Sequence, residues 1–390
     1  MTNQNITLNG VDGFTAFGHS YTWYNQDITA VYLGDDNPTG ANSLSMTLAG
    51  AAWKIGHLSL YNDSAFALNT VLTDANDGVA RRIDWLTLQD NGNATITLYN
   101  TRVRYIEGGE GGNVTLTLGS QQTKTVELWG TTNNVTLGSG NVEAMYLGDH
   151  NDFVRGGSGF VNYLELGGGT NTLLGGTGEF GSIRAQGNNT FVLSNGADAI
   201  TFGNGYNRLV LNGGFYGAVT AFSGTTGTNY YTINAAAEVR SIGLSGGKDT
   251  IVVAGHVQQI DVGSNDDKVF VTSGGRIDVL NLGDGNNTLS ASGDNVWAIN
   301  AYDGNDRLIL TAGQTDQADL IGGNNTVIIR GGYFVGSLKA NEGNDVVNMG
   351  GVDTEILQAN LGGGNNNVVI TSGRIGTLTM YDGDDRVTLI

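Results

Sequence analysis

Asn or Asp residues close a series of Gly-rich segments in this 390-residue chain, at intervals that average about 19.5 residues. Ca²⁺ takes six to eight hard oxygen ligands, which Asp carboxylates and the exposed carbonyls of a Gly-rich turn can supply. The segments that carry carboxylates are therefore candidate calcium sites. The candidate ligands are Asp149 with Asp152, Asp266 with Asp267, Asp284 alone, Asp303 with Asp306, Glu342 with Asp345, and Asp382 and Asp384 with Asp385.

A second explanation of these segments needs no metal. Acidic segments alternate with neutral ones such as GGNN (322–325) and GGGNNN (362–367). Carboxylates stacked every ~4.8 Å repel one another, whereas Asn side chains stack into hydrogen-bonded ladders. The Asp residues would then only occupy turns that suit them. With calcium, each neutral turn would instead add oxygens to an ion held by the acidic turn beside it, and the sequence leaves both explanations open.

The elements that position these residues follow from the repeat. Each Gly-rich turn precedes an alternating apolar run, as in YDGNDRLIL (302–310), and a second run follows midway, as in SGGRIDVLNL (273–282). Period-2 alternation predicts strands, and short units that cannot bury an apolar face alone must stack. We expect an all-β parallel β-solenoid of roughly 20 coils, with 19–20 residues per coil. The predicted inward residues are Leu308, Leu310, Val327, Ile329, Val347, Met349, Val368 and Ile370 in one sheet, and Leu280, Leu282, Leu338, Leu361, Leu378 and Met380 in the other.

Residues 1–85 are less regular than 86–390. We predict an N-terminal cap with degenerate coils in the first range and regular solenoid repeats in the second. The first range holds Trp23, Trp53 and Trp85. These aromatic residues could instead form a docking or sugar-stacking surface, and the sequence leaves that choice open. The last residues continue a regular apolar coil, which we expect a further segment, subunit or lattice partner to cover.

Composition narrows the class of partner. The formal net charge of −19, from 37 acidic and 18 basic residues, argues against nucleic acid and anionic lipid and favours divalent cations. The absence of Cys excludes disulfides and thiolate metal sites, and 63 Gly argue against a helical bundle. No apolar run reaches the length of a transmembrane helix, and the first residues lack the pattern of a signal peptide.

The strings GDGNNTL (283–289), DGNDRL (303–308) and EGNDVV (342–347) resemble the nonapeptide G-G-x-G-x-D-x-U-x of RTX proteins, the bacterial β-roll proteins with haemolysin-type calcium-binding repeats. The resemblance covers most of residues 146–390, although only one turn per coil matches where the family has two. It implies calcium ions between turns of successive coils. It also implies type I secretion, with folding outside the cell in Ca²⁺.

No catalytic pattern is found. The four His lie outside any HExxH motif, and there is no Cys nucleophile or GxSxG elbow. Arg102 and Arg104 point to one face of a strand and suit either an acidic substrate or protection of a sheet edge. We therefore expect a non-enzymatic, secreted structural protein of a bacterial S-layer, matrix, biofilm filament or adhesin, which associates with itself or with cell-surface polysaccharide. The alternative is a carbohydrate-active β-helix, a lyase, epimerase or binding module for acidic polysaccharide.

Overall fold

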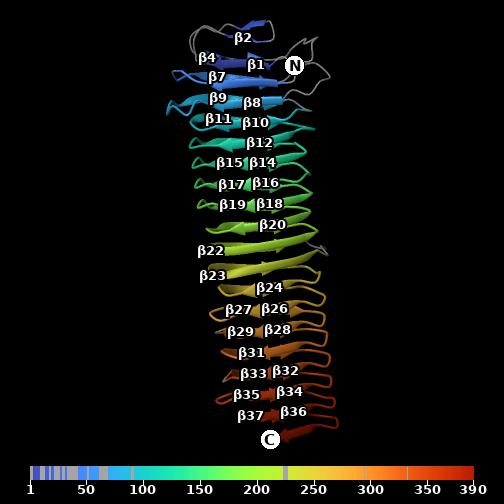
Figure 1. The fold of residues 1–390 in the computed structure, drawn as a ribbon. Coiled ribbons are helices and arrows are strands. Elements are labelled where there is room, and N and C mark those ends of the chain that lie inside the picture. Colours follow the sequence, from blue (N-terminus) through green and yellow to red (C-terminus); the bar gives the residue numbers. More distant parts are fainter. Residues whose placement is uncertain are drawn as a thin grey trace. The chain divides into compact units, whose positions relative to one another are not determined.

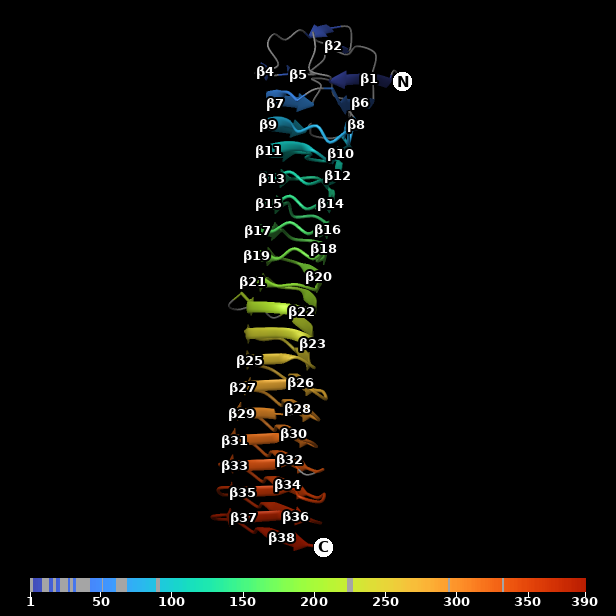
Figure 2. The same ribbon diagram turned by 90° about the vertical axis from the view of Figure 1, so that its left-hand side faces the viewer.

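The computed structural model describes residues 43–50, 52–60, 69–88, 92–222, 227–293, 295–331 and 333–390, together with the backbone of five short strands nearer the N-terminus. The chain is an all-β parallel β-solenoid of about 16 turns, and the described residues contain no helix. Two compact units form, one from 1–191 with 195–197 and the other from 192–194 with 198–390. Within each unit, strands stack coil upon coil in sequence order (Figure 1; Figure 2).

Two series of strands make up the coils. Strands of the first series follow the turns that end in Asn or Asp (Asx), or lie in register with strands that do. We call them Asx strands. They are β6 (Ser43–Leu48), β8 (Asn69–Asp74), β10 (Ala94–Leu98), β12 (Asn113–Leu118), β14 (Thr132–Thr136), β16 (Phe153–Arg155), β18 (Thr170–Leu174), β20 (Asn188–Leu193), β24 (Thr250–Val253), β26 (Lys268–Val271), β28 (Thr288–Ala291), β30 (Arg307–Leu310), β32 (Thr326–Ile329), β34 (Val346–Met349), β36 (Asn367–Ile370) and β38 (Arg386–Leu389).

The other series, the mid-coil strands, follows the second turn of each coil. It comprises β7 (Lys54–Leu60), β9 (Arg81–Leu88), β11 (Thr101–Gly108), β13 (Thr123–Leu128), β15 (Val142–Leu147), β17 (Val161–Leu166), β19 (Phe180–Ala185), β21 (Ala197–Phe202), β25 (His256–Asp261), β27 (Arg276–Gly283), β29 (Asn295–Ala301), β31 (Gln314–Leu320), β33 (Phe334–Ala340), β35 (Glu355–Asn360) and β37 (Arg374–Thr379). The long strands β22 (Tyr206–Ala221) and β23 (Thr228–Gly243) contribute to both series. The short strands are β1 (Asn3–Leu8), β2 (Phe14–Ala16), β3 (His19–Tyr21), β4 (Asp27–Ile28) and β5 (Val31–Tyr32).

The core consists of apolar columns that run through successive coils. In β30 the pattern Arg-Leu-Ile-Leu buries Leu308 and Leu310 and exposes Arg307, as period-2 alternation requires. Leu308 pairs in parallel register with Leu289 on one side and Val327 on the other. Eleven of the fourteen predicted inward residues are buried, and Ile370, Leu378 and Met380 in the last coils are half-buried. The predicted core is therefore largely confirmed.

Coil length accounts for part of the difference between the observed turns and the roughly 20 expected. From Asn133 onward, the ladder contacts described below join residues 18 to 22 positions apart. Near the N-terminus the coils are longer, because Ser43 pairs with Asn69 and Thr70 with Ala94. Parallel stacking thus already includes strands before residue 85, and the boundary predicted there stays a prediction. Trp23 lies outside the described residues, whereas Trp53 is buried and donates its indole N–H to the Ala49 carbonyl at 3.0 Å.

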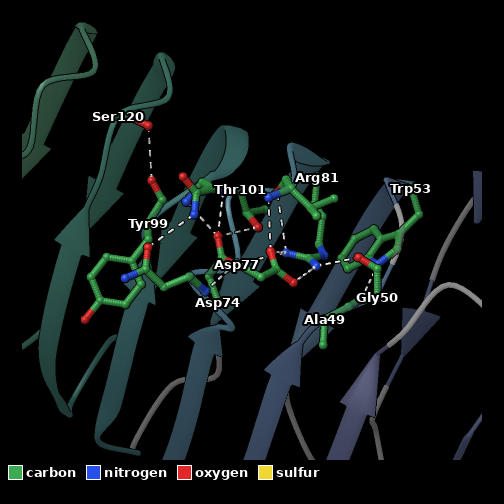
Figure 3. A network of polar contacts seen from close by, with 12 residues as sticks. Ala49, Gly50, Trp53, Asp74, Asp77, Arg81, Tyr99, Thr101 and Ser120 are labelled. Atoms are coloured by element: carbon green, nitrogen blue, oxygen red, sulfur yellow. Dashed lines mark hydrogen bonds and ion pairs between the residues drawn. The ribbon is translucent and has the colours of Figure 1, made fainter.

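A buried ionic network joins these longer coils (Figure 3). The Arg81 guanidinium contacts the Asp74 carboxylate at 3.2 Å and the Asp77 carboxylate at 2.6 Å, and it donates to the Gly50 carbonyl at 2.6 Å. Asp74 Oδ2 accepts the Thr101 backbone N–H at 2.7 Å and its hydroxyl at 2.9 Å. The network therefore ties together the coils that contain β6, β8 with β9, and β11.

Candidate functional site

The Asx turns hold an inner ladder of buried Asn and Asp side chains. Asn287 donates its backbone N–H to Asp306 Oδ1 in the next coil at 2.9 Å, Asp306 donates in the same way to Asn325 Oδ1 at 2.9 Å, and Asn325 to Asp345 Oδ1 at 2.8 Å. Backbone or side-chain N–H donors make every link. The inner ladder comprises Asn133, Asp152, Asn171 and Asn189 in the first unit, and Asn207, Asn229, Asp249, Asp267, Asn287, Asp306, Asn325, Asp345, Asn366 and Asp385 in the second.

An outer ladder is formed by the residues that immediately precede the inner ones. Here the direction reverses, because Asn305 Oδ1 accepts the backbone N–H of Asn324 in the following coil at 2.7 Å, and Asn324 Oδ1 accepts that of Asn344. The outer ladder of the second unit comprises Asp266, Asn286, Asn305, Asn324, Asn344, Asn365 and Asp384. The recurrent Asn-Asn and Asn-Asp pairs therefore satisfy backbone donors on both sides of each turn, where no sheet ladder reaches them.

Glycine is required where stacked turns approach each other. A Cβ built on Gly323 would lie 1.9 Å from the carbonyl oxygen of Gly304 in the preceding coil, and one on Gly343 would lie 1.8 Å from that of Gly323. Both residues have positive φ, 83° and 127°, where side chains add strain. These glycines allow the close stacking that brings the two ladders within hydrogen-bond distance.

The Asp members of the inner ladder differ from the Asn members in one atom. Asn325 donates its Nδ2–H to the turn carbonyl of Gly322 at 3.2 Å, and Asn171 donates to that of Gly167 at 3.0 Å. Asp has an oxygen, Oδ2, in place of this donor. It is buried without a hydrogen-bond partner in Asp152, Asp249, Asp267, Asp306 and Asp345.

Desolvation of these five carboxyls favours the neutral acid. Burial raises the pKa of Asp267 to about 8 and that of Asp152 to about 7. It raises the pKa of Asp249, Asp306 and Asp345 to about 6. A protonated carboxyl regains the donor that Asn has, so neutral Asp can replace Asn in the inner ladder.

The structure divides the predicted calcium ligands between two faces of the turns. Asp152, Asp267, Asp306, Asp345 and Asp385 belong to the inner ladder, and the first four are buried; the other predicted ligands, Asp149, Asp266, Asp284, Asp303, Glu342, Asp382 and Asp384, lie on the outer face. Predicted pairs such as Asp303 with Asp306 are therefore not brought together. Among the described residues, no group of three or more His, Cys, Asp or Glu side chains could hold a metal ion.

Two predicted ligands from alternate coils line the same hollow on the outer face. Glu342 and Asp382 line one surface hollow of about 590 Å³, with the neutral turn Gly362–Gly364 between them and Asn341 and Asn360 at its side. The hollow combines two carboxylates with amide and backbone carbonyl oxygens, which are the ligand types that calcium prefers. The inner carboxyls lack this arrangement, because they face the core and their Oδ1 atoms already accept N–H groups.

Comparisons with known proteins assign no relative. No family model, no curated protein and no solved structure matches this chain. In the parts of the chain that the structure describes, no helix has the length and apolar character needed to cross a membrane.

The repeat marks one Asn or Asp near the close of each Gly-rich turn, beginning with Asn93, Asn113 and Asn134. From Asp152 onward every marked residue is a member of the inner ladder, although the inward direction of these side chains was not anticipated. Near the start of the series, the inner position is Asn133 and not Asn134, while Asn93 and Asn113 are exposed. In register with Asn133 are Val114 and, one coil earlier, Ala94, so the ladder begins only at Asn133.

Proposed function

We propose that this chain is a non-enzymatic structural protein, secreted to the outside of a bacterial cell as a component of an S-layer, matrix, filament or adhesin. The observation that carries the proposal is the pair of Asx ladders, which are continuous from Asp266 to Asp384 and Asp385 in the second unit. Nearly all of the repeated turn residues are used to join one coil to the next. A sequence that repeats its polar side chains for stacking suits a scaffold, since a catalytic centre needs different side chains gathered at one place.

Assembly tests the structural function. We expect the full chain in millimolar Ca²⁺ to form ordered filaments, sheets or end-to-end dimers, because stacked solenoids associate through repeated surfaces. Negative-stain electron microscopy together with light scattering measures this. Strictly monomeric particles that release unsaturated or epimerised sugars from alginate or pectate would contradict the proposal and support a carbohydrate-active enzyme.

Calcium is the ion we propose for the outer face, at the hollow between Glu342 and Asp382. Its support is the ligand chemistry of that hollow and the RTX-like strings around it. An ion that binds only the folded chain stabilises it by mass action. With the dissociation constants of extracellular calcium modules, 10 mM Ca²⁺ would add about 1–3 kcal/mol to the free energy of unfolding.

Thermal melting in 10 mM Ca²⁺ and in EDTA tests this site. We expect a higher melting temperature in Ca²⁺ for the wild-type chain, and a smaller difference for the variant Glu342→Gln/Asp382→Asn. Glu143→Gln, which removes an exposed carboxylate from β15, is the matched control and should keep the full difference. Equal melting temperatures of the wild-type chain in the two buffers would contradict calcium binding. The ladders alone would then account for the repeated Asn and Asp residues of the turns.

A further inference from the structure

A row of aromatic rings crosses the mid-coil strands of the first unit, with Trp85 exposed and His57 and Tyr105 half-buried. His57 in β7 is in register with Trp85 in β9, and Trp85 with Tyr105 in β11. The Trp85 and Tyr105 rings stack with centroids 4.6 Å apart, and those of His57 and Trp85 lie 6.4 Å apart. Trp85 is 39% exposed. The Trp85 and Tyr105 rings are stacked at an interplanar angle of 27°, and the His57 ring is tilted by 57° to Trp85. The row is therefore a continuous aromatic strip that runs from coil to coil, with Trp85 exposed at its centre.

Basic side chains border this row on one side. Lys54, Arg82 and Arg102 are in register on β7, β9 and β11, three positions before the aromatic residues. Arg104 and Lys124 place their cationic groups 5.3 Å and 5.7 Å from the centroid of the Tyr105 ring. We call His57, Trp85 and Tyr105 with these five basic residues the basic–aromatic face.

Carboxylates neutralise only part of this charge. Asp84 forms ion pairs with Lys54 at 3.4 Å and with Arg82 at 2.6 Å. Arg102, Arg104 and Lys124 form no ion pair with any described residue of the chain. Five of the 18 basic residues thus gather on four neighbouring strands of a chain whose net charge is −19. This concentration indicates an anionic partner.

Protection of a sheet edge does not explain these residues. β11 pairs with β9 on one side and, from Tyr105 to Gly108, with β13 on the other, so the strand that carries Arg102 and Arg104 is not an edge strand. Arg102 and Arg104 are exposed and contribute little to the core. Their side chains remain available to a ligand.

We propose that the basic–aromatic face binds an acidic polysaccharide, a polymer that contains uronate residues. The apolar faces of sugar rings pack on exposed aromatic rings, and guanidinium groups bind carboxylates through paired hydrogen bonds. Both kinds of group follow the same direction, from coil to coil, so a polymer lying along the row meets them repeatedly. Glu107 and Glu127, in register on the opposite side of the row, can accept sugar hydroxyls. These two carboxylates favour a sugar polymer over single-stranded DNA, since DNA binds through many phosphate contacts and offers them no ring hydroxyls.

Binding of defined polymers to the full-length chain tests this proposal. Isothermal titration calorimetry would use polygalacturonate, fully methyl-esterified pectin, dextran and single-stranded DNA of similar length. We expect polygalacturonate to bind, with an affinity that falls as salt rises, and the methyl ester and dextran to bind at least tenfold more weakly. Equal affinity for dextran, tighter binding of DNA, or absence of polygalacturonate binding would overturn the proposal.

Two variants locate the site on this face. Arg102→Gln/Arg104→Gln changes only exposed side chains and should weaken polygalacturonate binding at least tenfold. Trp85→Ala should weaken it by a similar factor without changing the salt dependence, because it removes packing and leaves the charge. Arg307→Gln, at an exposed position of β30 in the second unit, is the control and should bind as the wild type does. Unchanged affinity of the Arg102/Arg104 variant, with the same thermal melting as the wild type, would refute the location.

Discussion

Asp306→Asn is expected to melt at a higher temperature than the wild-type chain at pH 8, and at the same temperature at pH 3. Asp306 is a buried member of the inner ladder whose Oδ2 has no hydrogen-bond partner, while Oδ1 accepts the Asn287 N–H. Asn at this position places a donor where the Asn members of the ladder contact turn carbonyls. The substitution therefore replaces a group that loses a proton by one that cannot.

The direction of this pH dependence follows from proton linkage. Burial raises the pKa of Asp306 from 3.8 to about 6 in the folded chain, so the folded state holds the proton more tightly than the unfolded state. The free energy of unfolding then falls as pH rises from about 4 through about 6, and stays constant above. A shift of about two pKa units corresponds to about 3 kcal/mol, or about 6–12 °C for a cooperative transition of a unit this size.

The reverse substitution in the neighbouring coil is the matched control. Asn325→Asp should lower the melting temperature at pH 8 by a similar amount and leave it unchanged at pH 3, because it adds a buried acid between Asp306 and Asp345. Hydrogen bonds and cations lower the pKa values of Asp77, Asp84 and Asp266, so these residues change the free energy of unfolding with pH in the opposite direction. Their contribution is the same in the variants and in the wild type, and it cancels in the comparison. A destabilised Asp306→Asn at pH 8 would contradict the neutral-acid interpretation of the ladder.

The fold was accessible from the sequence because its two signals are local and repeated. Period-2 alternation within each run and the recurrence near 19.5 residues together predict stacked coils, and Leu308 and Leu310 are buried as expected. The same alternation also carries information about the site. Asp306 lies two residues before Leu308, so its side chain points to the same inner face. Extending the period-2 alternation back to the turn residue therefore predicts the inner ladder.

Other features depend on coil lengths that the average repeat does not provide. Lys54 is in register with Arg82, and Arg82 with Arg102, yet the first pair is separated by a longer coil than the second. A period near 19.5 residues therefore does not align Lys54 with Arg82 or His57 with Trp85, and so does not predict that Lys54 and His57 belong to the basic–aromatic face. By contrast, the hollow between Glu342 and Asp382 follows the alternation of acidic and neutral turns that the sequence shows, because its two coils of 21 and 19 residues stay close to the average repeat.

Arg81 is the clearest case of a residue whose role depends on these irregular coils. Arginine side chains are rarely buried unless paired, and nothing in the string RRIDWLTL separates Arg81 from the half-exposed Arg82. In the structure Arg81 is 1% exposed and contacts residues from two coils, as Figure 3 shows. Because the coils that contain β6, β8 and β9 are longer than the repeat, their turns need this polar network in place of the Asx ladders.

Arg81→Met is expected to lower the free energy of unfolding by about 3–5 kcal/mol, the usual cost of leaving one partner of a buried ion pair alone. Asp74 would stay buried, with the Asn100 and Thr101 N–H donors but without a cation. Asp77→Ala should cost much less than Arg81→Met, since that carboxylate is 37% exposed and water replaces its partner. Urea denaturation of both variants, followed by tryptophan fluorescence, to which the buried Trp53 contributes, measures the difference. Equal losses for the two would mean that the Arg81–Asp74 contact adds nothing beyond a surface pair, and that hydrophobic stacking alone holds the longer coils in register.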